Sequence, residues 1–196
     1  MYPHYQKARN KAWEVLLHCK ISSLPIDLGE IADAYDLKVS IYSETSLVQL
    51  FRKDVLQGDG FIINNKSEKQ IFINDGIKSR NRRRFTLAHE LGHGILDHDI
   101  GVIHYRNSEI DSQTDMQELE ANVFARDLLM PATVLAALDI HTPEEIMELC
   151  HVSYQSAAIR AKRMELLYQR NLFNRHPLER QVREQFDNFI KNYPEK

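Results

Sequence analysis

Two histidines four residues apart, with a glutamate directly after the first, are the residues of this 196-residue chain best suited to chemistry. On a helix, His89 and His93 lie on one face, about 6 Å apart along the axis. Both imidazoles can therefore bind one tetrahedral metal ion, the geometry that zinc prefers. Glu90 lies about 100° around the helix from His89, poorly placed as a ligand but able to take a proton from water. The segment predicts a hydrolytic metal site with Glu90 as the catalytic base.

A catalytic zinc needs a third protein ligand. The metzincin pattern is excluded because Leu96 and Asp99 stand where it requires glycine and histidine. The next helix, predicted over residues 115–130, offers two glutamates. Glu120 falls within an apolar stripe, where a carboxylate needs a partner, whereas Glu118 lies on a polar face. We therefore predict that Glu120 binds the metal, with a buried salt bridge as the alternative, and that Glu118 is solvated.

Other polar residues could support such a site. Three candidates to orient a metal-bound imidazole, each of which could equally have an ordinary structural role, are Asp97, Asn122 and Asp127. Three candidates to donate to an oxygen that becomes negative in the reaction are His104, Tyr105 and Tyr154. No pattern selects among the last three. We interpret His98, about 140° around the helix from His93, as a residue that packs or caps the helix end.

The composition indicates an intracellular protein. The net charge of -3 gives no sign of a general nucleic-acid-binding surface. The two cysteines, Cys19 and Cys150, form no CxxC pair and suit buried apolar positions in a reducing cytoplasm. No apolar run approaches the roughly 18 residues that a membrane span needs. The first ten residues lack the apolar stretch of a signal peptide. We expect a cytoplasmic chain without a membrane segment.

The order of patterns indicates an α+β fold. Helical spacing is predicted over 5–18 and 27–35, and again from residue 79 onward. Between these segments, short β-branched or aromatic runs predict a small sheet; they are residues 38–42, 48–51, 61–64 and 70–74. Helices, then strands, then helices favour α+β over a wound parallel sheet. We predict a metal-binding domain over 1–135, a helical region over 136–175 and a C-terminal helix within 176–196.

The helical region has the spacing of a helix-turn-helix. Residues 142–150 and 154–164 predict two helices, with Ser153 as the N-cap of the second. Arg160, Lys162 and Arg163 could contact phosphates. The alternative is a helical pair that packs on the rest of the chain or docks a substrate. The acidic net charge and the small number of basic residues favour packing over DNA binding. The oligomeric state stays open.

Three segments together resemble the ImmA/IrrE family of metallopeptidases. Residues 84–93 read RFTLAHELGH, residues 118–125 read ELEANVFA and residues 128–131 read LLMP. The resemblance covers about residues 8 to 165. It implies a zincin-like core with one zinc ion per chain. In that family the ligands are the two histidines and the glutamate before Ala-Asn, which implies His89, His93 and Glu120 here, with Glu90 as the base.

The resemblance also implies a substrate class. Such peptidases are typically bacterial or carried by phages and mobile elements, and several cleave a helix-turn-helix repressor, often encoded next door. The alternative is a zinc-containing DNA- or protein-binding regulator without proteolytic activity. A structural zinc site normally fills its fourth position with another Cys or His. Because Cys19 and Cys150 have no ligand spacing, an open catalytic site is favoured.

Overall fold

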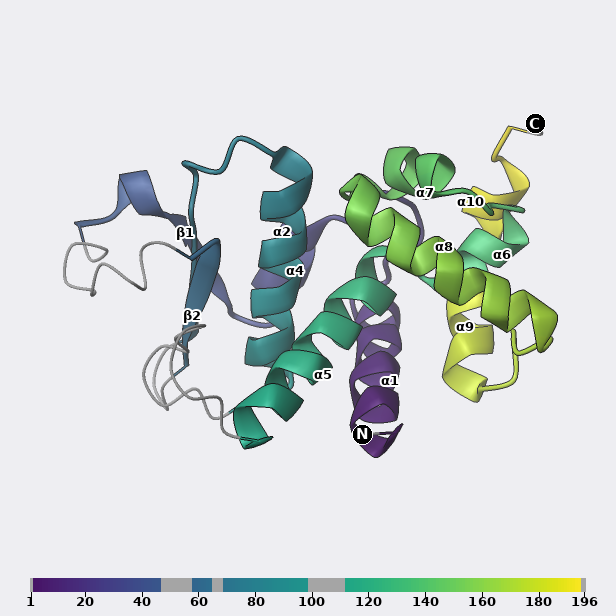
Figure 1. Cartoon of the computed structure of the whole chain (residues 1–196), viewed down its shortest axis with the longest axis horizontal. Helices are drawn as coiled ribbons and strands as arrows, with labels where there is room; N and C mark the ends of the chain where they lie inside the picture. The colour runs from purple at the N-terminus through teal and green to yellow at the C-terminus, as the bar shows by residue number, and fades with distance from the viewer. Residues whose placement is uncertain (1, 47–57, 65–68, 99–111, 195–196) are drawn as a thin grey trace. The chain divides into compact units, whose positions relative to one another are not determined.

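The computed structural model describes residues 2–46, 58–64, 69–98 and 112–194 and confirms an α+β fold (Figure 1). The elements, in chain order, are α1 (Tyr2–His18), α2 (Leu28–Ala34), β1 (Lys38–Ile41), η1 (Tyr42–Glu44), β2 (Gly60–Asn64), β3 (Lys69–Ile73), α4 (Arg80–Ile95), α5 (Ser112–Leu129), α6 (Ala132–Ala137), α7 (Pro143–Cys150), α8 (Tyr154–Gln169), α9 (Pro177–Gln185) and α10 (Asp187–Lys191). None of the helices within the described ranges is long and apolar enough to cross a membrane.

The chain forms two compact units. The sheet unit comprises Met1–Ala8 and Leu28–Ala125, and the helical unit comprises Arg9–Asp27 and Arg126–Lys196, each taken over its described residues. These units divide the chain differently from the regions predicted over 1–135, 136–175 and 176–196. Those boundaries stay a prediction.

The sheet has three strands in the order β1-β3-β2. β3 is parallel to β1 and antiparallel to β2, with Phe72 opposite Phe61. As the central strand, β3 buries Ile71, Phe72 and Ile73, which explains its nearly continuous apolar sequence. Three of the predicted strands are confirmed, and the one predicted over 48–51 lies outside the described residues.

Helix α4 packs against β2 and β3, and α2 contacts α4 and β1 (Figure 1). Two glycines allow this close packing. A Cβ on Gly94 would lie 2.9 Å from side-chain carbons of both Ile62 and Leu37. A Cβ on Gly92 would lie 3.0 Å from Phe124 Cδ1 and 3.3 Å from the Cα of Ala121, both on α5. The glycines of the histidine segment therefore let α4 approach the sheet on one side and α5 on another.

The helical unit contains the predicted helical pair. Thr142 and Glu145 form a capping box at the start of α7, and Pro143 occupies its first turn. His151 adopts a left-handed conformation after α7, and Ser153 caps α8. The single C-terminal helix predicted within 176–196 is two helices, α9 and α10, which meet at Phe186.

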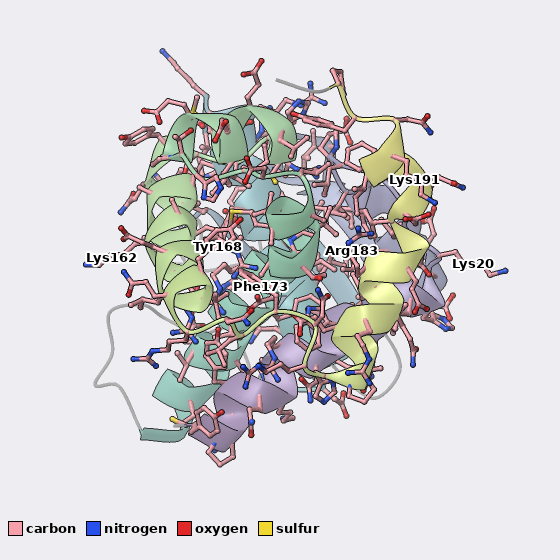
Figure 2. The ribbon with its side chains drawn as sticks, turned by 90° about the vertical axis from the view of Figure 1, so that its right-hand side faces the viewer. Lys20, Lys162, Tyr168, Phe173, Arg183 and Lys191 are labelled. Atoms are coloured by element: carbon pink, nitrogen blue, oxygen red, sulfur yellow. The ribbon has the colours of Figure 1, made fainter. Side chains whose placement is uncertain are left out.

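Side chains from separate segments join the helical unit together. Tyr168 near the end of α8 packs against Phe173, with ring centroids 4.9 Å apart (Figure 2). Gln185 of α9 donates hydrogen bonds to the carbonyl oxygens of Leu16, at 2.7 Å, and Ile21, at 2.6 Å. The Leu16 carbonyl oxygen also accepts from the Ile21 N–H at 3.0 Å, so Gln185 adds a second bond at the end of α1 and ties α9 to it.

A buried ion pair lies at the centre of the helical unit. Arg160 of α8 is 1 % exposed, and its Nη1 lies 3.1 Å from Asp127 Oδ1. Its Nη2 donates to the carbonyl oxygen of Met130, while Arg126 pairs with the other oxygen of Asp127. Burial raises the pKa of Asp127, but the charges and hydrogen bonds of Arg126 and Arg160 outweigh burial, and the pKa is lowered overall. Asp127, predicted as a candidate to orient an imidazole, instead balances two guanidinium groups.

Replacing Asp127 with asparagine is expected to lower the free energy of unfolding by about 3–5 kcal/mol, because it leaves buried guanidinium charge uncompensated. Urea unfolding of the metal-free protein at pH 7 measures this change. Asp139→Asn is the matched control, since the Asp139 side chain is 87 % exposed, and its effect should stay within about 0.5 kcal/mol. Equal stability of both variants would contradict a central role for the ion pair.

In the Asp127→Asn variant, the free energy of unfolding should also depend less on pH than it does in wild type. Asp127 is ionised in the folded protein at pH values where the unfolded chain, with an aspartate pKa of about 3.9, takes up a proton. Its stabilising effect is therefore fully present well above pH 4 and is lost as the pH falls through the lower folded pKa. The difference in free energy of unfolding between wild type and Asp127→Asn, measured by urea unfolding, should become smaller as the pH falls below about 4.

Candidate metal site

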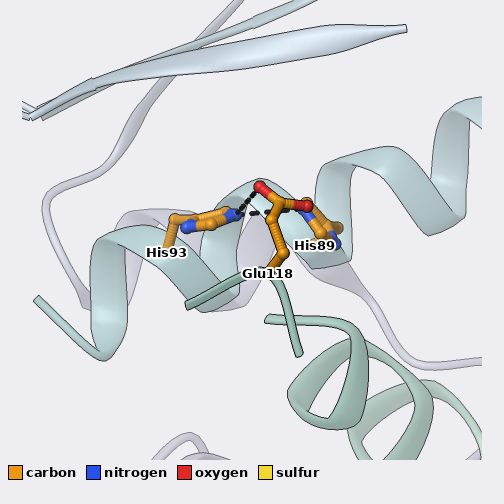
Figure 3. Close-up of side chains that lie close together, drawn as sticks. All are labelled: His89, His93 and Glu118. Carbon is orange, nitrogen blue, oxygen red and sulfur yellow. Dashed lines mark hydrogen bonds and ion pairs between the residues drawn. The ribbon is translucent and has the colours of Figure 1, made fainter. Parts of the chain in front are cut away.

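Three side chains of the sheet unit converge on one point. His89 and His93 come from α4 and Glu118 from α5, and their potential ligand atoms all lie within 4.8 Å of one another (Figure 3). The two Nε2 atoms are 3.0 Å apart. Glu118 places Oε2 at 3.4 Å from His89 Nε2 and Oε1 at 3.3 Å from His93 Nε2. The predicted convergence of the two histidines is therefore present, with a carboxylate beside it.

The spacing of these atoms fits a tetrahedral ion. Ligand bonds of about 2.0–2.2 Å in a tetrahedron put neighbouring ligand atoms about 3.3–3.6 Å apart. Each contact between Glu118 and a histidine has that length, although Oε2 faces His89 and Oε1 faces His93, and the two imidazole nitrogens are slightly closer together. Two imidazoles and one carboxylate are also the ligand types of open, catalytic zinc sites. These three residues could hold one such ion.

The hydrogen bonds of Asn122 fix the tautomer of His89. Asn122 Nδ2 donates to the carbonyl oxygen of Glu118 at 2.8 Å, so its Oδ1 is the atom that faces His89 Nδ1, at 3.2 Å. An amide oxygen can only accept, which makes His89 Nδ1 the donor. Nε2 of His89 then carries a lone pair directed at the cluster. Asn122 thus has the contact expected of a residue that orients a metal-bound imidazole.

The protonation states also suit metal binding. Burial lowers the pKa of His93 to about 4, so the ring is neutral at neutral pH. For Glu118, burial raises the pKa, but hydrogen bonds and charge interactions with His89 and His93 outweigh it and lower the pKa overall. A neutral imidazole and an ionised carboxylate are the forms that bind a metal ion.

Glu120 lies in a different set of contacts. It is buried, as predicted, yet it bonds to His98 Nε2 at 2.9 Å, Lys7 Nζ at 2.9 Å and His4 Nδ1 at 2.5 Å. Glu118 and Glu120 are two residues apart, about 200° around the helix, so one cannot share the environment of the other. The structure brings His89 and His93 together with Glu118 and gives Glu120 the buried ion pair that the sequence left as its alternative.

Glu118 was assigned from sequence to a solvated face, whereas its side chain is only 32 % exposed and contacts both histidines. The apolar stripe located the buried side of α5 and did not show which polar face meets α4. A signal was nevertheless present. Glu118 and Asn122 are four residues apart and therefore share a face, and a polar pair on that face is what two metal-bound imidazoles require.

Glu90, the predicted base, is buried on α4 between the two histidines in sequence. Burial raises the pKa of Tyr42, and the negative charges of Glu90 and Asp59 raise it further. The Tyr42 hydroxyl is thereby kept protonated and able to donate. Its ring packs against Phe61 with centroids 5.9 Å apart. The pKa of Tyr42 thus responds to the charge of Glu90, and the sequence gave no reason to single out this tyrosine.

The remaining candidates lie elsewhere or outside the described residues. Asp97, expected to orient an imidazole, is 80 % exposed at its side chain and pairs with Lys69 at 2.9 Å. Tyr154 is 55 % exposed at the start of α8, in the helical unit. His104 and Tyr105 fall outside the described residues. His98, interpreted as a packing residue, contacts both His93 and Glu120.

The segment that carries this site matches a known protein family. A family model for peptidase family M78, described as the IrrE N-terminal-like domain, matches residues 45–162. A search of curated proteins finds none that matches the chain. The matched segment includes α4, which carries both histidines and Glu90, and α5, which carries Glu118 and Glu120. The chain therefore belongs to this metallopeptidase family, as the sequence motifs predicted.

Proposed function

We propose that this chain is a zinc-dependent endopeptidase whose substrate is a helix-turn-helix transcriptional repressor. The observation that carries the proposal is the convergence of His89, His93 and Glu118 on one point, in a chain whose family is that of metallopeptidases. The buried carboxylate of Glu90 lies on the same helix as the two histidines. Two imidazoles and a carboxylate that could hold zinc, with a base on the same helix, suit the metal-assisted hydrolysis of a peptide bond.

We propose His89, His93 and Glu118 as the ligands of one zinc ion per chain, with Glu118 in place of Glu120. Support comes from the contacts of 3.3 and 3.4 Å between Glu118 and the two imidazoles. Glu120 is already held by two histidines and a lysine. When bound, a zinc ion supplies a Lewis acid that polarises water and the scissile carbonyl.

Glu90 acts as the general base and then as the general acid. Its carboxylate accepts a proton from the attacking water as the new carbon–oxygen bond forms, and it returns that proton to the amide nitrogen as the carbon–nitrogen bond breaks. Donors to the carbonyl oxygen stay a prediction among His104, Tyr105 and Tyr154.

The choice of a repressor as substrate rests on family resemblance, and the rival is a zinc-containing DNA- or protein-binding regulator. One observation disfavours DNA binding. Of the three basic residues of α8 considered for phosphates, Arg160 is buried and paired with Asp127. Lys162 is exposed and projects away from α8 (Figure 2). We place the reaction in the bacterial cytoplasm, where Cys19 and Cys150, which form no disulfide with each other, stay reduced.

The ligand proposal predicts different metal contents for two neighbouring glutamate variants. Wild type should retain about one zinc per chain after dialysis against a weak chelator, measured by elemental analysis. Glu118→Ala should weaken zinc binding by more than about 100-fold, beyond the range typical of residues that only contact ligands. Glu120→Gln should still reach one zinc per chain when zinc is in excess. Loss of zinc from Glu120→Gln with full retention in Glu118→Ala would restore Glu120 as the ligand.

Cleavage is tested by co-expressing the chain with the helix-turn-helix repressor encoded beside its gene and looking for repressor fragments. Wild type should produce fragments, and Glu90→Ala should reduce the rate by about 10²–10⁴-fold, the usual contribution of a general base. Glu165→Ala, which changes an exposed glutamate of α8, is the control and should cleave like wild type. Intact repressor throughout, with zinc bound to wild type, would contradict the repressor as substrate.

A further inference from the structure

A continuous line of contacts, buried over its first two steps, runs from one proposed ligand to the first turns of α1. His93 Nδ1, the ring nitrogen that does not face the cluster, lies 3.0 Å from His98 Nδ1. His98 Nε2 lies 2.9 Å from Glu120 Oε2. The same oxygen of Glu120 accepts from Lys7 Nζ at 2.9 Å, and its Oε1 lies 2.5 Å from His4 Nδ1. His98 and Glu120 are both buried.

We propose that His98 and Glu120 are positioning residues that hold His93 in the tautomer whose Nε2 binds the metal. The inference rests on the proposed metal site but is independent of which substrate is cleaved. Neither residue touches the point where the three ligand atoms converge. They act through His93, and Lys7 and His4 act through Glu120.

The hydrogen bonds can be assigned in only one consistent direction when Nε2 of His93 is a ligand. Nε2 then carries no proton, so Nδ1 of the neutral His93 ring carries it and donates to His98. His98 Nδ1 accepts that bond and is unprotonated, which places the His98 proton on Nε2. That N–H points at Glu120 Oε2, an acceptor. Each donor in the line meets one acceptor, and the line ends at a carboxylate.

Glu120 is suited to end the line as an anion. Its two oxygens lie within hydrogen-bonding distance of Lys7, His98 and His4, and the Lys7 ammonium compensates its negative charge. An ionised carboxylate behind two hydrogen-bonded imidazoles increases the electron density on the ligand nitrogen and fixes the ring orientation. Asn122 has the corresponding role at His89 with a neutral amide, so the two ligands receive different support.

The backbone after α4 places His98 for this contact. Asp97 has φ of 54°, a left-handed conformation that reverses the chain beyond the C-cap, Leu96. The His98 N–H then bonds back to the carbonyl oxygen of His93 at 3.1 Å, the pattern of a Schellman motif. Such motifs often pair two apolar side chains at these positions. Here two imidazoles take that place, with ring centroids 5.0 Å apart.

Lys69 of β3 holds the turn from outside. Its Nζ donates to the carbonyl oxygen of Gly94 at 2.9 Å and to Asp97 Oδ1 at 2.9 Å. Gly94 is in the last turn of α4, where carbonyl groups have no intrahelical partner. Lys69 therefore ties the end of α4 to the left-handed residue, and the position of His98 follows from this local geometry.

The test measures zinc affinity by competition with a chromophoric chelator in wild type and four variants. His98→Phe keeps a ring without nitrogen and should weaken zinc binding by about 10–100-fold, the range typical of residues that orient ligands. Glu120→Gln removes the charge and should fall in the same range. His98→Asn keeps an acceptor oxygen near the place of Nδ1 and should recover part of the loss. Lys7→Met changes a side chain that is 57 % exposed and should have the smallest effect.

Two further readouts separate positioning from folding. The absorption spectrum of the cobalt-substituted protein should shift in His98→Phe and Glu120→Gln, because the geometry of His93 changes. The unfolding midpoint of each metal-free variant reports its folding alone. If His98→Phe or Glu120→Gln does not fold, the more conservative His98→Asn, compared with the exposed Lys7→Met, still carries the test through the order of their zinc affinities.

The outcomes decide between the inference and the proposed function. Weaker zinc binding with a shifted cobalt spectrum in folded variants supports the inference, whether or not a repressor is cleaved. Zinc affinity within threefold of wild type in both His98→Phe and Glu120→Gln overturns it and leaves the metal site standing. A wild-type chain that binds no zinc overturns both together.

Discussion

Two imidazole nitrogens lie 3.0 Å apart with a carboxylate beside them. If the Nε2 atom of each histidine is a metal ligand, all of these atoms are acceptors. Acceptors that converge at this distance repel one another unless a proton or a cation lies among them. Their convergence depends on a close approach of α4 and α5, and Gly92 makes that approach possible because a Cβ there would press on Phe124 and Ala121. The packing of the sheet unit thus serves one electrostatic arrangement.

The two glutamates of α5 contact different partners around the metal site. Glu118 faces the histidines, and Glu120 faces His98 and the first turns of α1. Both are buried enough for desolvation to raise the pKa, and in both the surrounding donors lower it further than burial raises it. The same helix therefore presents one anion to the convergence point and a second anion to the histidine behind it. That pairing concentrates two charges in an interior that tolerates neither alone.

Sequence reasoning reached the parts of this site that depend on helical spacing. The positions of His89, Glu90 and His93 follow from the period of one helix, and the short strands follow from their β-branched and aromatic residues. The partner of each glutamate could not be read in the same way, because it depends on the rotation of α5 against α4. Burial was predicted well for Glu120 and poorly for Glu118, since apolar periodicity marks the core side of a helix and not a polar contact between helices.

His98 illustrates a second limit. On an ideal helix, His98 would lie about 140° around the axis from His93 and would therefore point away from the site. The helix ends before His98, however, and Asp97 in its left-handed conformation turns the chain back. Aspartate adopts that conformation more readily than most residues, so the sequence permitted the turn without specifying it. The break between α9 and α10 at Phe186 is a similar case, in which an amphipathic pattern continues across an interruption of the helix.

The α7–α8 pair has the spacing of a helix-turn-helix, but a basic residue of α8 lies in the core of the helical unit. The caps at Thr142 and Ser153 are those of a helix-turn-helix, and they explain the geometry of the pair without reference to DNA. A phosphate-binding helix would expose Arg160. Here Arg160 is buried, forms an ion pair with Asp127 and donates to the carbonyl oxygen of Met130. Breaking a buried ion pair costs more free energy than an exposed contact with a phosphate would gain. The pair is therefore better suited to stabilise the helical unit than to bind a polyanion.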